Sequence, residues 1–278
     1  MNTPLNSDFF HFTFNTDGYT WNLTSIWDQA FELGPISMRV DYLLAGKLKQ
    51  TGIYWRSNQI KAAYSLHSSL GNLQIVDVYP SPDAHGLEYQ LSFAVSDLHR
   101  LFLWKLRLTN HGESPVQIER ITLLDLINPE KTFSKLSDPA FFSNGWGSWD
   151  HAGVFGRQDN FRRTRLGIFS APMRINPGTP HPKQRGVFAS DMFGVLGDRA
   201  SRQGWLVGFL SQEQHFGSIE ADLSSPGFSL WANGDSTQLD PGDSMETDWA
   251  CIQFVSLDSP DPLGSYLDAV ARQAGIDE

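Results

Sequence analysis

Apolar and polar residues alternate along much of the chain, which is the pattern of β-strands that bury one face. The first two alternating runs each place three large apolar side chains on one side: Phe10, Phe12 and Phe14, then Tyr19, Trp21 and Leu23. Further strands are expected at residues 38–44, 52–57, 73–79, 87–95, 100–109, 116–126, 186–196, 204–211, 215–222, 228–232 and 246–257. The alternation breaks between Val116 and Leu126, which predicts a β-bulge in that strand.

One helix is predicted near the end of the chain. Ser259 is a candidate N-cap, Pro260 and Pro262 suit a first turn, and Gly275 is suited to end the helix. An apolar stripe at helical spacing supports it, formed by Leu263, Tyr266, Leu267, Val270 and Ala274. By contrast, residues 128–165 are irregular, and residues 171–186 contain four prolines and read as an extended loop.

Closely spaced strands with turns between them predict an all-β protein with two large packed antiparallel sheets and a short C-terminal helix. With 278 residues and 40% hydrophobic content, the chain can form a sizeable core. The 19 Phe, 9 Trp and 7 Tyr also favour β structure, because aromatic side chains suit pleated, half-buried surfaces.

Charge and cysteine content narrow the classes of function. The formal net charge of −10 disfavours binding to nucleic acid, since an acidic protein repels phosphate backbones. The single cysteine, Cys251, lies in an apolar run and is expected to be a buried thiol. Residues 1–14 lack the pattern of a secretory signal, and no run reaches the roughly 18 apolar residues of a membrane span, so a cytoplasmic location is expected.

No metal site and no cofactor is expected. The eight histidines are scattered, and one cysteine cannot provide a zinc-binding spacing. The chain also lacks the glycine-rich motifs that bind dinucleotides or phosphates and the nucleophile motif of α/β-hydrolases.

The most informative segment is residues 141–151, in which Trp146 and Trp149 stand among Gly and Ser. Two interpretations stay open. The indoles fill the core beneath a long connection, or they form a stacking surface for a sugar ring. In the second case Asn144, Asp150 and His151 are placed to hydrogen-bond sugar hydroxyls.

Carboxylates near this segment raise the question of glycoside hydrolysis, which uses a pair of carboxyl groups at a defined separation. Asp150 and Asp159 are the candidates by position. The alternative, favoured here, is that both cap turns or face water.

Four arginines gather just beyond, at Arg157, Arg162, Arg163 and Arg165. On an acidic chain such a local patch is suited to dock an acidic surface or another domain. A solvated face is the competing interpretation.

Three segments together resemble a known family. Residues 142–149 are similar to the N-G-W-x-S-W segment in the N-terminal domain of glycoside hydrolase family 36, the α-galactosidase group. Residues 204–219 and 239–249 resemble two further segments of that domain, and Tyr266 fits its closing connector. The similarity covers most of the chain after Phe141 and is weaker before it.

The resemblance implies a β-supersandwich domain over residues 1–258 and a connector over residues 259–278. In that family the sandwich precedes a catalytic (β/α)₈ barrel that carries a K-W-D nucleophile motif. This chain has no K-W-D, because Trp149 and Asp150 follow Ser148. The resemblance therefore implies the N-terminal domain without catalytic residues, as part of a larger hydrolase.

An accessory role follows from the resemblance: the domain would support the barrel and place Trp146 and Trp149 at the rim of an α-galactoside site. Gly147 stands where Gln is commoner in the family, which puts a polar sugar contact there in doubt. Contacts within a homo-oligomer are also implied. The alternatives are a stand-alone carbohydrate-binding β-sandwich module and, least favoured, a self-sufficient hydrolase acting through Asp150.

Overall fold

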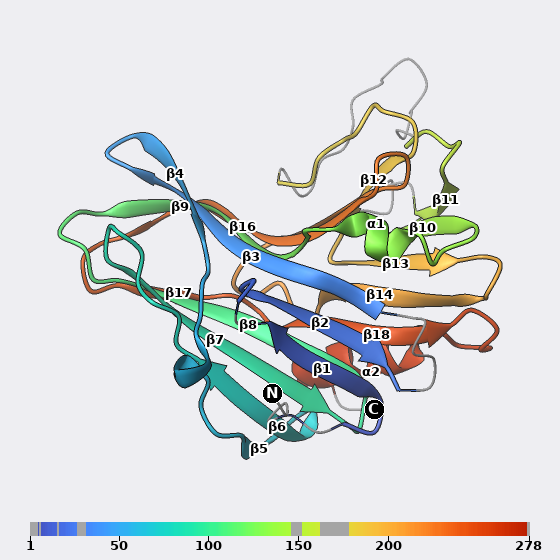
Figure 1. Ribbon diagram of the computed structural model, residues 1–278, viewed down its shortest axis with the longest axis horizontal. Coiled ribbons are helices and arrows are strands. Elements are labelled where there is room, and N and C mark those ends of the chain that lie inside the picture. Colours follow the sequence, from blue (N-terminus) through green and yellow to red (C-terminus); the bar gives the residue numbers. More distant parts are fainter. Residues whose placement is uncertain are drawn as a thin grey trace.

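Two antiparallel sheets packed face to face make up the molecule, as Figure 1 shows for the computed structural model, which describes residues 5, 7–15, 17–26, 32–145, 152–161 and 178–276. The first sheet, sheet A, has the order β1 (Phe10–Asn15), β2 (Thr20–Ser25), β3 (Glu32–Leu44), β9 (Val116–Leu126), β16 (Gly227–Leu239), β15 (Gly217–Asp222) and β12 (Val187–Asp191), with β4 (Lys47–Gly52) paired to β3. The second, sheet B, has the order β11 (Gly153–Gly156), β10 (Pro139–Ser143), β13 (Phe193–Asp198), β14 (Gln203–Phe209), β18 (Ala250–Ser256), β8 (Leu101–Asn110), β7 (Leu87–Ser96), β6 (Gly71–Val78) and β5 (Tyr64–Ser68), with β17 (Ser244–Glu246) paired to β8. The predicted all-β sandwich is confirmed.

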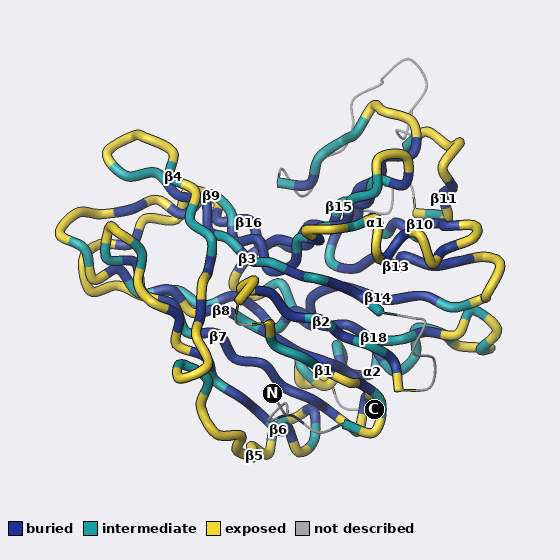
Figure 2. The backbone as a smooth tube through the Cα atoms, viewed as in Figure 1, coloured by how far each residue is buried: buried dark blue, intermediate teal, exposed yellow. Residues whose placement is uncertain are grey.

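The main core lies between the sheets and is rich in aromatic rings. Trp21 from sheet A packs against Trp104 and Phe102 from sheet B, with ring centroids 5.2 Å and 5.4 Å apart. The Trp104 indole N–H donates to the Leu123 carbonyl at 3.0 Å, so its polar atom is satisfied inside the core. Figure 2 shows the strands buried along most of their length, with exposure concentrated in turns and edges.

A second, smaller core lies on the outer face of sheet B beneath α2 (Gly264–Gln273). Tyr266 and Ala269 of the helix are buried there with Cys251, and the Tyr266 hydroxyl donates to the Phe209 carbonyl at 2.8 Å. The thiol is thus buried, as its apolar surroundings in the sequence predicted.

The predicted start of this helix is wrong, whereas its end is confirmed. The Ser259 hydroxyl accepts from the Asp261 N–H in the preceding turn, and the helix begins five residues later, with Leu263 at the N-cap. Gly275 has a positive φ of 67° and closes the last turn by donating to the Arg272 carbonyl.

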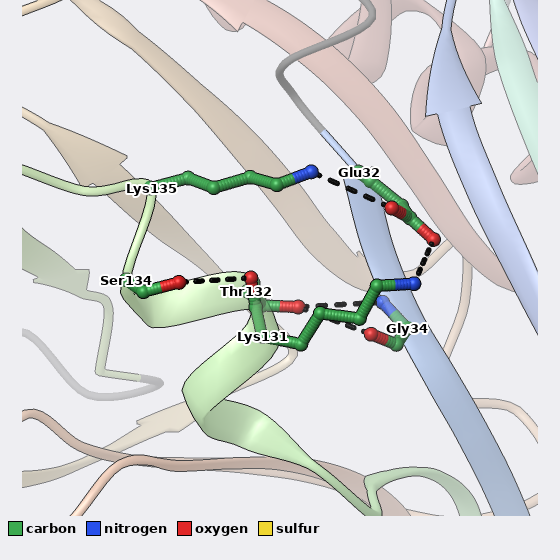
Figure 3. Close-up of polar contacts among 6 residues, drawn as sticks. All are labelled: Glu32, Gly34, Lys131, Thr132, Ser134 and Lys135. Atoms are coloured by element: carbon green, nitrogen blue, oxygen red, sulfur yellow. Dashed lines mark hydrogen bonds and ion pairs between the residues drawn. The ribbon is translucent and has the colours of Figure 1, made fainter.

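The connection after β9 contains a short helix, α1 (Pro129–Phe133), that contacts sheet A. Figure 3 shows Lys131 and Lys135 reaching the two carboxylate oxygens of Glu32 at 2.9 Å and 3.4 Å. Burial raises the pKa of Glu32, but the hydrogen bonds and charges of the two lysines outweigh it and hold that pKa below its ordinary value. The contact fixes where the chain turns toward β10.

Between Val187 and Asp198 the chain crosses from one sheet to the other. The sequence predicts one strand over 186–196, but Met192, with a φ of 62°, divides it into β12 in sheet A and β13 in sheet B. Met192 donates to Gly217 of sheet A and accepts from Phe209 of sheet B. The crossing brings β10 and β12 together.

Candidate functional site

The tryptophan segment is the connection of a β-hairpin at the edge of sheet B. Strands β10 and β11 pair antiparallel, with Ser143 opposite Gly153 and Phe141 opposite Phe155. Residues 144–152 join them, and β11 lies at the outer edge of the molecule in Figure 1. Trp146, Trp149, Asp150 and His151 lie outside the described residues, so their contribution to a sugar site stays a prediction.

Asn144, the one candidate sugar contact that the structure describes, anchors the segment to β12. Its backbone N–H donates to the Ser190 hydroxyl at 2.7 Å, and its carbonyl accepts from the Asp191 N–H at 2.9 Å. Its side-chain amide also donates to the Asp191 carbonyl at 3.5 Å. Asn144 therefore fixes the base of the hairpin connection.

A buried polar cluster continues from this anchor. Thr179 lies 2.5 Å from the Asp191 carboxylate and 2.7 Å from the Ser218 hydroxyl, which accepts from the Asn233 amide at 2.9 Å. The Trp231 indole N–H donates to the other end of the Asn233 side chain at 3.0 Å. Because all of these groups are less than a tenth exposed, each needs its partners to offset desolvation.

Close packing at Gly178 completes the cluster. A Cβ atom at Gly178 would lie 2.1 Å from the Asn233 amide, so a larger residue could not take this place without displacing Asn233. Residues 144–145 and 178–179 flank two segments outside the described residues. One polar cluster thus contacts Asn144 in the tryptophan segment and Gly178 and Thr179 in the proline-rich segment.

The face of sheet A that turns away from the main core is unusually polar next to this cluster. The strand registers place Arg39, Thr122 and Trp231 in one row and Asp41, Arg120 and Asn233 in the next. The Arg120 guanidinium stacks 4.5 Å from the centroid of the Trp231 ring, and Arg39 pairs with Asp125 at 3.1 Å. These residues could not be brought together from the sequence, because alternation within a strand does not show which strands of a sheet are neighbours.

Two carboxyl groups on this face have raised pKa values. Burial raises the pKa of Asp125, and the Arg39 charge offsets this only in part. Burial also raises the pKa of Glu220; Arg120 works against the shift and the nearby Asp222 charge adds to it. Both residues lie beside Ser229, one strand away on either side, so their backbones are about 10 Å apart.

The remaining candidates lie beyond β11. The Asp159 carboxylate accepts from the Gly156 N–H at 2.7 Å, and the Asp159 N–H donates to the Gly156 carbonyl. Asp159 therefore caps this turn, as one of the two interpretations of its sequence position expected. Arg157 is exposed in that turn. Arg162, Arg163 and Arg165 lie outside the described residues.

Comparison with known proteins supports the fold. No protein-family model and no curated protein sequence matches the chain. Among solved structures, the α-N-acetylgalactosaminidase NagBb from Bifidobacterium bifidum aligns with a TM-score of 0.55 and 8% identity, covering 98% of this chain and 38% of that protein. An α-galactosidase from Lactobacillus brevis aligns with a TM-score of 0.49 and 13% identity over 84% of this chain and 31% of that one. A family 36 α-galactosidase from Geobacillus stearothermophilus aligns with a TM-score of 0.47 and 15% identity over 78% and 30%.

The first of these alignments shows that the chain shares its β-sandwich fold with part of a glycoside hydrolase. The resemblance identified in the sequence is thus confirmed at the level of the fold. The chain spans about a third of the length of these solved structures. Within the described residues, none of the helices is long and apolar enough to cross a membrane.

Proposed function

We propose that this chain is a non-catalytic domain of an α-galactosidase-like glycoside hydrolase. It packs against a catalytic (β/α)₈ barrel of the same protein and lends Trp146 and Trp149 to the rim of the sugar site. The observation that supports the proposal is the arrangement of the strands on either side of the N-G-W-x-S-W segment. Strands β10 and β11 pair as an edge hairpin, and Asn144, the first residue after β10, is anchored to β12.

An apolar groove beside this hairpin supports the accessory role. The groove has a volume of about 220 Å³, and its lining includes Phe142 of β10, Val154 of β11 and Val195 of β13. The Val154 side chain is 58% exposed, which is unusual for a valine in a strand. The groove therefore offers apolar surface that a neighbouring domain would bury.

The same hairpin leads directly to the arginine patch. Arg157 follows β11 and is exposed, and we assign it together with Arg162, Arg163 and Arg165 to an interface with an acidic surface of the barrel or of a second copy. Arginine suits such an interface because its planar guanidinium makes paired hydrogen bonds with carboxylates.

The test uses the longest natural reading frame that contains this sequence, assayed on an aryl α-galactoside. Trp146→Ala and Trp149→Ala are each expected to lower kcat/KM about tenfold, mainly through KM, because a rim residue contributes to binding. Tyr54→Ala is the matched control, since Tyr54 is an exposed aromatic residue that packs on Tyr19 elsewhere on the surface. Unchanged kcat/KM in both Trp variants would contradict the rim role.

Two further outcomes separate the competing functions. If the isolated chain hydrolyses the substrate and Asp150→Asn abolishes this activity, the chain is a self-sufficient hydrolase and the proposal is overturned. If the isolated chain binds a galactoside, Trp149→Ala abolishes this binding and the reading frame encodes no barrel, the chain is a stand-alone carbohydrate-binding module.

A further inference from the structure

A second groove, of about 370 Å³, opens where two neighbouring strands of sheet B separate. Pairing between β18 and β8 ends at Ile252 and Phe102, whereas pairing between β18 and β14 continues to Ser256 and Gln203. Residues 253–256 therefore have a neighbouring strand on one side only. The groove occupies the other side, with Phe9 and Arg100 on one wall and residues 259–265 on another.

A buried amide without its full set of partners lies in this groove. Gln253 is 6% exposed, and its side-chain Oε1 has no hydrogen-bond partner among the described residues. Its neighbours on the same face of β18, Cys251 and Val255, belong to the apolar core beneath α2. The alternating pattern would thus favour an apolar residue at 253, and a polar residue that breaks such a pattern points to function.

Arg100 adds a charged donor at the edge of the groove. It lies between β7 and β8 with a φ of 55°, in the left-handed region, and its guanidinium stacks 5.0 Å from the centroid of the Phe9 ring. The stacking restricts the long side chain before any ligand arrives. Asp261, on another wall, carries the opposite charge, so the groove does not select for a charged ligand.

Hydrogen bonds join the walls to one another. The Ser265 hydroxyl donates to the His99 carbonyl at 2.7 Å, which ties the first turn of α2 to the residue next to Arg100. The His99 ring lies 3.2 Å from the Asp268 carboxylate on the next turn of the helix. The groove is therefore formed before binding, which lowers the entropic cost of taking up a ligand.

We propose that this groove binds a neutral monosaccharide unit. A hydroxyl group both donates and accepts, so it suits the Gln253 amide and accepts from Arg100 as well. The half-buried Phe9 and Phe254 offer apolar contact for the C–H face of a sugar ring. The volume lies near the lower end of the roughly 300–1,000 Å³ of ligand pockets, which fits one sugar ring. This site does not depend on the proposed catalytic partner.

The test is titration of the full chain with D-galactose, D-glucose and the polyol glycerol. Saturation-transfer NMR and calorimetry measure the binding. A Kd of about 1 mM is expected for at least one of the two sugars and weaker binding for glycerol. Gln253→Leu is expected to weaken sugar binding at least tenfold while keeping or raising Tm, because leucine has a similar size and removes the buried acceptor. Arg100→Asn should also weaken sugar binding, because it removes the guanidinium donor. Asparagine is chosen since it tolerates the positive φ at this position.

Gln117→Leu is the matched control, because Gln117 is an exposed glutamine on β9 of the other sheet. Its affinity should equal that of the wild type. Absence of saturable binding of either sugar, or equal affinity in wild type, Gln253→Leu and Arg100→Asn, would overturn the proposal. Binding that is lost in Trp149→Ala but kept in Gln253→Leu would place the sugar at the hairpin and would also overturn it, while leaving the proposed accessory function intact.

Discussion

At the level of residues, hydrogen bonds of single polar side chains hold the described residues that flank the tryptophan segment. Asn144 and Thr179 hydrogen-bond to Asp191 of β12, and Thr179 and Asn233 to Ser218 of β15. Residue types that suit sugar binding in the sequence therefore have structural partners. A sequence shows that an amide or hydroxyl is present, but not whether the fold already satisfies it. For this reason Asn144 could be named from its neighbours, whereas Gln253, inside an apolar strand, could not.

Glu220 provides a residue-level prediction because burial raises its pKa above the ordinary value despite the charge of Arg120. A carboxyl group that binds its proton more tightly when folded contributes less stability as pH rises from the unfolded pKa, about 4.3, through the folded one. Glu220→Gln removes this loss. The variant should therefore match or exceed the wild type in free energy of unfolding at neutral pH, by no more than about 1 kcal/mol given partial solvent screening.

Urea denaturation of both proteins from about pH 4 to pH 7 measures this effect. The advantage of the variant is expected to grow as pH rises. Parallel curves for the two proteins, or an advantage that grows as pH falls, would contradict the assignment of a raised pKa to Glu220.

At the level of elements, alternation was a reliable guide wherever a strand buries one face along its whole length. The bulge predicted in 116–126 is confirmed: Asp41 pairs with Arg120 and Tyr42 with Ile118, which leaves Glu119 as the extra residue. The prediction over 52–57 is wrong, because β4 ends at Gly52 and a 3₁₀ turn follows at Ser57–Gln59. Strand β5, an edge strand with little burial, was missed since it has no core side to reveal it.

Helix α2 allows an element-level prediction. Tyr266 is fully buried, packs on Phe193 with ring centroids 5.0 Å apart, and donates to Phe209. Tyr266→Ala is expected to lower the free energy of unfolding by about 3–5 kcal/mol, the usual cost of deleting a buried aromatic ring. Leu267→Ala, at the neighbouring position that is 49% exposed, should stay within about 0.5 kcal/mol of the wild type.

Chemical denaturation of the two variants measures the difference. Equal and small effects would show that α2 does not contribute to the stability of the sandwich. A large effect of Leu267→Ala would show that the outward side of the helix is covered in solution.

The arrangement of the whole molecule could be predicted only in part. Two large sheets follow from the number of strands, and the resemblance around residues 142–149 predicts the supersandwich. The crossing at Met192 was not predictable, because its positive φ occurs at a residue type that rarely adopts one. That crossing joins the sheets and places the end of β10 beside β12 of sheet A.

Cys251 reports on whether the sandwich and its covering helix open together. The thiol is fully buried between sheet B and α2, and burial raises its pKa far above the ordinary value, so it reacts only after the structure opens. In native buffer, labelling by a disulfide reagent should be slow, with an opening free energy equal to that of global unfolding, about 5–15 kcal/mol. Tyr266→Ala should speed labelling at least about a hundredfold, given its expected cost, and Leu267→Ala should leave the rate unchanged. Labelling of the wild type that is much faster than global unfolding allows, yet slower than that of an exposed thiol, would instead show that α2 detaches from sheet B on its own.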